Sequence, residues 1–262
     1  MGTTSNKDAS LVKSLDRAID IVEALSHHPD GVKVTGLAAS MNLPKSSVFR
    51  VLNTLKTRGY VQQNPASERY SLSFKFLSLA RSVAQENDLR NIASDHLREL
   101  RNATDETVHL AVPIGHAMVY IDKVESARSV RLSSQIGQLA NFHSTALGKA
   151  YLSALPPEER EALVANLTLE RRTERTLVTR HDLLEELERC NRQHFAIDNV
   201  ENEDGVRCVG AAVRVSEADP VAAISISAPS SRFTKRQAMT AGPLCARAAG
   251  EISSHLRDAA LA

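Results

Sequence analysis

The stretch LPKSSVFRVLNTLKTRGYV, residues 43–61, decides the fold of the first part of the chain. Pro44 suits the first position of a helix, because its missing N–H would have no partner there. Gly59 favours the end of that helix, since glycine readily adopts the backbone conformation that follows a helix terminus. Between these positions, apolar residues recur at helical spacing: Val48, Val51, Leu52 and Leu55. The pattern therefore predicts an amphipathic helix with one buried face.

Two helices are predicted before this stretch and a β-hairpin after it. Residues 14–27 and 35–41 each carry apolar residues at helical spacing behind a capping hydroxyl. The predicted N-caps are Ser14 and Thr35, and the predicted apolar stripes are Leu15, Ile19, Val22, Leu25, Leu37, Ala38 and Met41. Residues 60–61 and 70–72 predict two short strands joined by a turn. Three helices, the last two joined tightly, and then a hairpin are typical of a winged helix-turn-helix.

The polar face of residues 44–58 predicts a recognition helix for DNA. Such a helix needs short polar or basic side chains in its first turns, so that it can approach base edges and phosphates. The predicted DNA-binding residues are Lys45, Ser46, Ser47, Arg50, Asn53, Lys56 and Arg69. The charges agree, because residues 1–75 contain ten Lys and Arg against six Asp and Glu, whereas the rest contains 22 against 25. A small helical domain with an ordinary solvated face is the alternative.

The composition of the whole chain is that of a globular protein. Its 262 residues are 42% hydrophobic and 24% charged, which allows two modest domains with cores of their own. No apolar run approaches the roughly 18 residues of a membrane helix, and the N-terminus lacks a signal-peptide pattern. A cytoplasmic protein without a membrane partner is therefore expected. The three cysteines are far apart and the histidines show no metal-binding spacing, so no disulfide framework, metal site or cofactor is expected.

A helical stretch joins the first part of the chain to a region of different pattern. Residues 72–101 fit either a rigid linker to the DNA-binding part or a core helix of the second domain. The predicted strands that follow are 107–114, 118–124, 129–136, 195–200, 206–215 and 221–228. The predicted helices are 146–155, 157–166, 181–193 and a final stretch that Thr234 caps and Gly242-Pro243 interrupts. Strands, then helices, then strands favour an α+β fold with a mostly antiparallel sheet, in a chain divided into residues 1–75, 76–102 and 103–262.

Several segments together resemble the IclR family of bacterial regulators, over about residues 10–258. The matching segments are LDRAIDIVEAL (15–25), residues 43–61, GQLANFHSTALGKAYLSAL (137–155), FAIDNVENEDGVRCVGAAV (195–213) and VAAISISAPSSRFT (221–234). The third of these is similar to the family pattern G-x-x-x-P-x-H-x-T-A-x-G-K-A, with Asn141 where the family has Pro. The loop before the following helix can therefore differ from the family's.

The resemblance implies a GAF-like effector domain that binds a small organic or sugar acid. It also implies dimers or pairs of dimers, and control of a catabolic operon through a pseudo-palindromic site on double-stranded DNA. The effector-binding residues that it implies are Thr145, Ala146, Asp198, Cys208, Ser225 and Ser227. Free N–H groups at a helix start favour a carboxylate, and two serines in alternate positions on a strand point to one face.

Other functions and simpler roles stay open on the residues alone. An enzyme in which Cys208 acts with His143 on an acyl or amidine substrate lacks an oxyanion loop beside the cysteine, and it gives residues 1–75 no task. A redox or light-independent signalling module that acts through protein contacts is a third hypothesis. Asp198 is otherwise a turn cap, the two serines face outward on a half-buried strand, and Cys208 is an inert core residue. Lys149 is expected to bond carbonyl groups or to face water.

Overall fold

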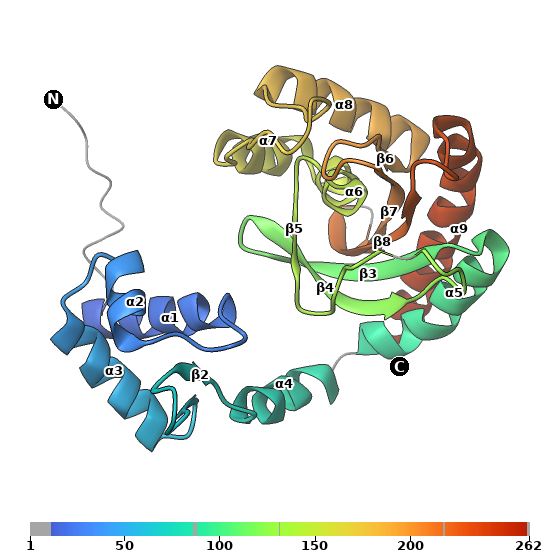
Figure 1. The fold of residues 1–262 in the computed structure, drawn as a ribbon. Helices are drawn as coiled ribbons and strands as arrows, with labels where there is room; N and C mark the ends of the chain where they lie inside the picture. The colour runs from blue at the N-terminus through green and yellow to red at the C-terminus, as the bar shows by residue number, and fades with distance from the viewer. Residues whose placement is uncertain (1–11, 86–87, 131, 217, 261–262) are drawn as a thin grey trace, which may run out of the picture. The chain divides into compact units, whose positions relative to one another are not determined.

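The chain forms two compact units in the computed structural model, which describes residues 12–85, 88–130, 132–216 and 218–260. The N-terminal unit is Met1–Glu86 and the C-terminal unit is Asn87–Ala262 (Figure 1). Hydrophobic clusters of buried residues lie within each unit. No helix in the described ranges has the length and apolar character that crossing a membrane requires.

The N-terminal unit is a winged helix-turn-helix followed by a further helix. Its elements are α1 (Lys13–Ser26), α2 (Val34–Ser40), α3 (Lys45–Thr57), β1 (Val61–Gln63), β2 (Tyr70–Leu72) and α4 (Lys75–Gln85). β1 and β2 form an antiparallel hairpin, and Tyr70 also pairs with Val32 ahead of α2. The core consists of Ile21, Leu25, Leu37, Ala38, Val48, Leu52, Val61 and Tyr70. This core joins the first three helices to the hairpin and confirms the fold predicted for this part of the chain.

The structure corrects the predicted starts of these helices. α1 begins at Lys13 and α2 at Val34, so Ser14 and Thr35 lie inside helices instead of at their caps. Pro44 is the N-cap of α3 and not its first helical residue. The capping pattern therefore located the helix starts to within two residues, because neighbouring residues at a helix start compete for the same role.

The buried face of α1 agrees with the predicted one at Leu25 but differs from it at Leu15 and Ile19. Leu15 and Ile19 are 58% and 49% exposed, whereas Ile21 and Leu25 are fully buried. The helix carries two apolar stripes, and only the one through Ile21 and Leu25 packs in the core. Periodicity could not distinguish them, because both stripes have helical spacing.

The C-terminal unit is a six-stranded antiparallel sheet with helices on both faces (Figure 1). The strands are β3 (Thr107–Ile114), β4 (Ala117–Val124), β5 (Leu139–Asn141), β6 (Ala196–Asp198), β7 (Val206–Ser216) and β8 (Asp219–Pro229), in the order β5-β4-β3-β8-β7-β6. The helices are α5 (Asp88–Thr104), α6 (Ala146–Ala154), α7 (Pro157–Ala165), α8 (Arg180–Gln193) and α9 (Lys235–Ala260). The α+β class and the antiparallel sheet are as predicted.

The sheet separates two hydrophobic cores. On one face, α5 and α9 cover strand residues that include Val209, Ile224 and Ile226. On the other face, α6 and α8 cover a second set that includes Ala111 and Ala223. Side chains alternate along a strand, so neighbouring residues of β8 belong to different cores. α5 is thus a core helix of this unit, which is one of the two roles left open for the predicted helical stretch.

The predicted strand at residues 129–136 is wrong. Its described residues form no strand, and the chain pairs with β4 through β5 instead. The main-chain oxygens of Leu132 and Ser134 accept hydrogen bonds from the Lys123 ammonium at 3.2 and 2.7 Å. A side chain therefore takes the acceptors that a neighbouring strand would have used. We call residues 132–138 the strap.

The predicted interruption at Gly242 and Pro243 is also wrong, because α9 is continuous through both residues. A proline inside a helix costs about 3 kcal/mol or more, since it removes a hydrogen bond. Ala238 and Cys245, before and after the proline, are fully buried against the sheet, and such burial offsets the cost. Gly242 is required by packing, because a Cβ there would lie 2.5 Å from the ring of Phe195.

Candidate ligand pocket and nucleic-acid interface

One face of α3 presents most of the side chains predicted to bind DNA. Because Val48 and Leu52 fix the opposite face in the core, the polar residues of this helix point to solvent. The exposed ones are Lys45, Ser46, Arg50, Asn53 and Lys56, and Ser47 is half-buried. The helix therefore offers a basic and hydroxyl-bearing surface of the kind that a major groove accepts.

Two of the predicted DNA-binding residues also make contacts inside the N-terminal unit. The Lys56 ammonium donates a hydrogen bond to the Gln63 side chain at 2.9 Å, which links α3 to the hairpin. The Arg69 guanidinium donates to the main-chain oxygen of Gly31 at 3.0 Å. Arg69 thus ties the hairpin to the segment between α1 and α2, a structural role in addition to the predicted one.

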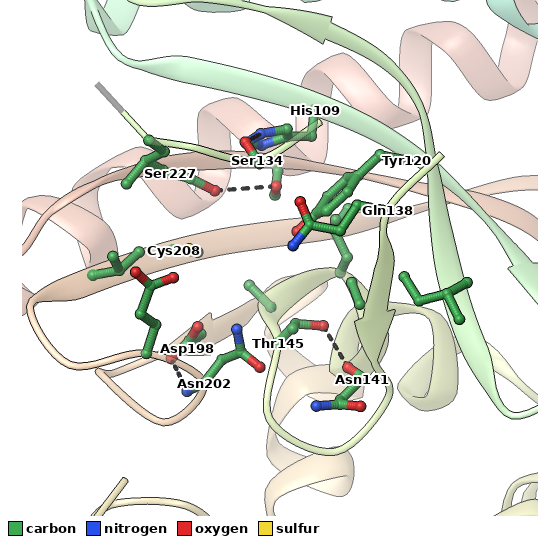
Figure 2. A pocket seen from close by; sticks show the side chains of 18 of the residues that line it. His109, Tyr120, Ser134, Gln138, Asn141, Thr145, Asp198, Asn202, Cys208 and Ser227 are labelled. Carbon is green, nitrogen blue, oxygen red and sulfur yellow. Dashed lines mark hydrogen bonds between the residues drawn. The ribbon is translucent and has the colours of Figure 1, made fainter. Parts of the chain in front are cut away.

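The C-terminal unit contains a polar cavity of about 290 Å³ between the sheet, the start of α6 and the strap (Figure 2). All six residues predicted to bind an effector line it: Thr145, Ala146, Asp198, Cys208, Ser225 and Ser227. The sheet register explains this, because Cys208 pairs with Ser227 and Gly210 with Ser225 across β7 and β8. The two serine hydroxyls lie 3.4 Å apart and are buried, so these residues do not simply face solvent.

Two glycines bring the start of α6 close to its neighbours. A Cβ at Gly210 would lie 2.8 Å from the main-chain oxygen of Ala146, and one at Gly148 would lie 2.4 Å from the main chain of Phe142. Thr145 caps the helix, and its hydroxyl accepts a hydrogen bond from the Gly148 N–H at 3.0 Å. The first N–H groups of a helix lack partners within the helix, so this wall of the cavity favours an anionic group.

Asp198 is both a turn cap and part of the cavity wall. Its Oδ1 accepts hydrogen bonds from the N–H groups of Glu201 and Asn202 at 2.6 and 3.3 Å. Burial raises the pKa of its carboxyl to about 7, although the ammonium of Lys149 acts in the opposite direction. The carboxyl group therefore changes its charge near neutral pH.

The residues of the enzyme hypothesis do not act together in this site. Cys208 lines the cavity, but burial raises the pKa of its thiol well above the ordinary value, which disfavours the thiolate that a nucleophile needs. The Nε2 of His143 instead donates to the main-chain oxygen of Glu170 at 3.0 Å, and the buried ring fixes the loop before α6.

His109 of β3 and Tyr120 of β4 were missed by the sequence analysis, although both line the cavity. Their rings lie with centroids 4.8 Å apart, and His109 Nε2 is 2.7 Å from the Ser134 hydroxyl of the strap. Burial lowers the pKa of His109 to about 3, so the ring is neutral, and its Nδ1 is buried without a hydrogen-bond partner among the described residues. A lone histidine in the apolar pattern of residues 107–114 was the available signal. Further lining residues that were missed are Ser134, Gln138, Arg172 and Asn202.

The two units together define a class of protein. A winged helix-turn-helix with a basic recognition helix is a DNA-binding module, and a polar cavity of this size suits a small molecule. In the part of the chain that the structure describes, no group of three or more His, Cys, Asp and Glu side chains is placed to hold a metal ion. The arrangement is that of a transcription regulator that carries its own sensor domain.

Comparisons with known proteins identify the family. Residues 14–65 match the model of the IclR helix-turn-helix domain, and residues 81–254 match the model of the bacterial transcriptional regulator IclR C-terminal domain. The chain therefore belongs to the IclR family of transcriptional regulators.

Individual relatives are similar over nearly their whole length. The HTH-type transcriptional regulator KdgR of Escherichia coli (strain K12) is 33% identical over 251 residues, which cover 96% of this chain and 95% of KdgR. The crystal structure of Thermotoga maritima IclR is 31% identical, with a TM-score of 0.71 over 94% of this chain and 100% of that one. An IclR homolog of Microbacterium hydrocarbonoxydans, solved in complex with 4-hydroxybenzoate, shares the fold at 20% identity, with a TM-score of 0.76 over 94% and 99% of the two chains. The chain is accordingly a regulator and not an enzyme.

Proposed function

We propose that this regulator binds a pseudo-palindromic operator as a homo-oligomer, and that a small organic or sugar acid in the cavity changes its affinity for that operator. In this proposal residues 1–75 bind DNA, and residues 103–262 bind the effector and take part in the oligomer together with the N-terminal unit. Residues 76–102 link the two parts of the chain, with α5 packed in the core of the C-terminal unit. The protein acts in the cytoplasm on a catabolic operon. The observation that carries the proposal is the convergence of the six predicted residues on one polar cavity.

On the DNA side, α3 is the recognition helix. Arg50 contacts a base edge or a phosphate, and Ser46 and Ser47 approach the sugar-phosphate backbone or base edges from the first turn of the helix. The remaining contacts are assigned to Lys45, Asn53, Lys56 and Arg69. The exposure of α3's polar face supports this assignment.

On the ligand side, the cavity suits a small acid that also carries hydroxyl groups. The helix start at Thr145 offers N–H groups to a carboxylate, and the exposed Arg172 also lines the cavity. Asp198, Ser225 and Ser227 present oxygens that exchange hydrogen bonds with hydroxyl groups. The volume of about 290 Å³ corresponds to a compact metabolite.

Exposed apolar side chains on the N-terminal unit support assembly with a second copy. Leu15 and Ile19 of α1 are 58% and 49% exposed, and Phe74 and Leu77, beside and in α4, are 81% and 66% exposed. Large apolar side chains left in water mark interaction surfaces. A pseudo-palindromic operator needs two recognition helices related by a two-fold axis, so a second copy is the partner that fits.

The test of this function is the sequencing of genomic fragments that the purified protein retains at moderate salt, followed by affinity measurements with a panel of small organic and sugar acids. A narrow set of fragments with a common inverted repeat, released or tightened by at least one acid, is the expected result. Retention of all fragments with a steep dependence on salt would contradict sequence-specific binding. Specific retention that no acid alters would contradict the effector assignment.

A further inference from the structure

Lys149 is fully buried next to the cavity without being part of its wall. Its ammonium donates hydrogen bonds to the main-chain oxygen of Ile197 at 2.6 Å and to Glu201 Oε2 at 2.5 Å. Glu186 Oε1 of α8 lies 3.7 Å away. A buried lysine is costly unless it is paired and hydrogen-bonded, so these contacts account for its presence in the core. Two of the three partners, Ile197 and Glu201, flank Asp198 in the sequence, which indicates a second role for the lysine.

We propose that Lys149 is a positioning residue of the effector site, which holds the turn at residues 198–202 so that Asp198 and Asn202 form one wall of the cavity. The link to effector binding rests on the proposed function, whereas the effect of Lys149 on the turn does not. Lys149 donates hydrogen bonds on both sides of Asp198 in the sequence, to the main-chain oxygen of Ile197 and to the side chain of Glu201.

The turn needs such an anchor because its backbone is strained. Val200 has a φ of 65°, in the left-handed region that a β-branched residue rarely adopts. A conformation of this kind costs about 1–3 kcal/mol and persists only where its surroundings impose it. The surroundings here include the Thr173 hydroxyl, which donates to the oxygen of Val200 at 2.8 Å, and the Thr176 hydroxyl, which donates to the oxygen of Glu201 at 2.6 Å. Lys149 is the cationic member of this set.

The same helix carries both the anchor and another part of the cavity lining. α6 begins behind Thr145, and Lys149 lies one turn later, where its N–H donates to the oxygen of Thr145 at 3.0 Å. The helix start and the Asp198 turn are therefore fixed to one rigid element. A ligand that contacts both walls meets a preformed arrangement, which lowers the cost of binding.

Lys149 keeps its charge in this environment. Burial alone would lower the pKa of the ammonium, but Glu201 and Glu186 outweigh it, and the net pKa is raised. The neighbouring Cys190 thiol remains neutral, because burial raises its pKa to about 12. The charge of Lys149 also affects Asp198: Lys149 lowers the pKa of the Asp198 carboxyl, and Glu201 raises it. The other ionisable groups that interact with the Asp198 carboxylate are Tyr120, Arg207 and Cys208.

The test is amide hydrogen exchange of the full-length protein without ligand, in Lys149→Met and in a matched control, Arg160→Met. Arg160 is also a buried cation, paired with Glu188 of α8, and it is not part of the cavity wall. The Glu201 and Asn202 amides, which bond Asp198, are expected to exchange about tenfold to a hundredfold faster in Lys149→Met, while other amides of the C-terminal unit match the control. The proposal would be overturned if these two amides were as protected in Lys149→Met as in the native protein. It would also be overturned if both variants lost protection uniformly across the C-terminal unit.

Glu201→Gln tests the same contact if Lys149→Met does not fold. The amide removes the charge, and its single oxygen cannot accept from both the Lys149 ammonium and the Asn199 N–H as the two carboxylate oxygens do. Faster exchange of the same two amides is therefore expected. The titration midpoint of Asp198, followed by carbon NMR, is expected to fall, because Glu201 raises it in the native protein. No change in either quantity would overturn the proposal. Failure of every acid to alter DNA binding would instead contradict the proposed function and leave the exchange result standing.

Discussion

Asp198 combines a structural and a binding task in one carboxyl group. Its Oδ1 closes the turn that leads out of β6, and the same side chain lines the cavity. Burial raises its pKa to about 7, so its charge depends on conditions close to neutral pH. An acid that binds beside it meets less repulsion when the carboxyl group is protonated. The effector affinity is therefore expected to fall as the pH rises through neutrality.

Asp198→Asn should remove a pH dependence of stability. The folded pKa of about 7 lies above the ordinary value of 3.8, so between those values the native state holds a proton that the unfolded state has lost. The contribution of this group is therefore fully present below about pH 4 and is lost as the pH rises through about 7. Urea unfolding between about pH 5 and about pH 8 should show a shallower decline for the variant than for the native protein. Parallel slopes for the two proteins would refute the assigned pKa.

Arg50→Ala should weaken operator binding by about 1–3 kcal/mol if the guanidinium contacts a base. Arg50 is exposed on the polar face of α3, so its removal leaves the core of the N-terminal unit intact. Arg247→Ala, which removes an exposed arginine from the C-terminal unit, is the control and should bind DNA normally. Fluorescence anisotropy with the selected operator measures both. An affinity equal to that of the control would remove Arg50 from the interface.

At the scale of elements, the sequence predicted the regular helices and strands. It did not predict the irregular segments, whose conformation depends on hydrogen bonds from side chains. The recognition helix, the hairpin and most of the sheet have periodic apolar patterns, which the structure confirms. The strap overlaps the predicted strand at residues 129–136, yet it forms no strand, and two of its main-chain oxygens accept hydrogen bonds from Lys123. The lining residues that belong to family motifs were predicted correctly. His109 was not, because it reaches the cavity only through the pairing of β3 with β8. Such long-range pairing is not visible in local spacing.

Two glycines inside helices give a matched test of close packing. Gly148 of α6 is confined, because a Cβ there would lie 2.4 Å from the main chain of Phe142. Gly250 of α9 is open, with nothing within 4 Å of a Cβ. Gly148→Ala should destabilise the protein by about 1–3 kcal/mol or more, whereas Gly250→Ala should stabilise it by roughly 0.5–1 kcal/mol. Denaturant unfolding of both variants measures the difference, and similar values for the two would contradict the packing of α6 described above.

At the scale of the whole molecule, the proposed regulation requires the cavity to influence the DNA-binding part. Within the C-terminal unit, β3 supplies His109 to the cavity and Val108 and Leu110 to the core that α5 shares. α5 follows α4 in the sequence, and we expect a change in the cavity to reach this helix through β3. We expect the acid to favour one of two arrangements of the oligomer, since a ligand shifts an equilibrium only by its difference in affinity for the two states.

The measurement that tests this account most directly is operator affinity with and without the effector acid, in the native protein and in Ser225→Leu. The larger side chain should fill part of the cavity and remove the response, while α3 and its affinity for the free operator remain unchanged. The account predicts a shift of about fivefold or more in the native protein and none in the variant. A full response in a folded Ser225→Leu protein would show that the acid acts elsewhere and would contradict the central claim.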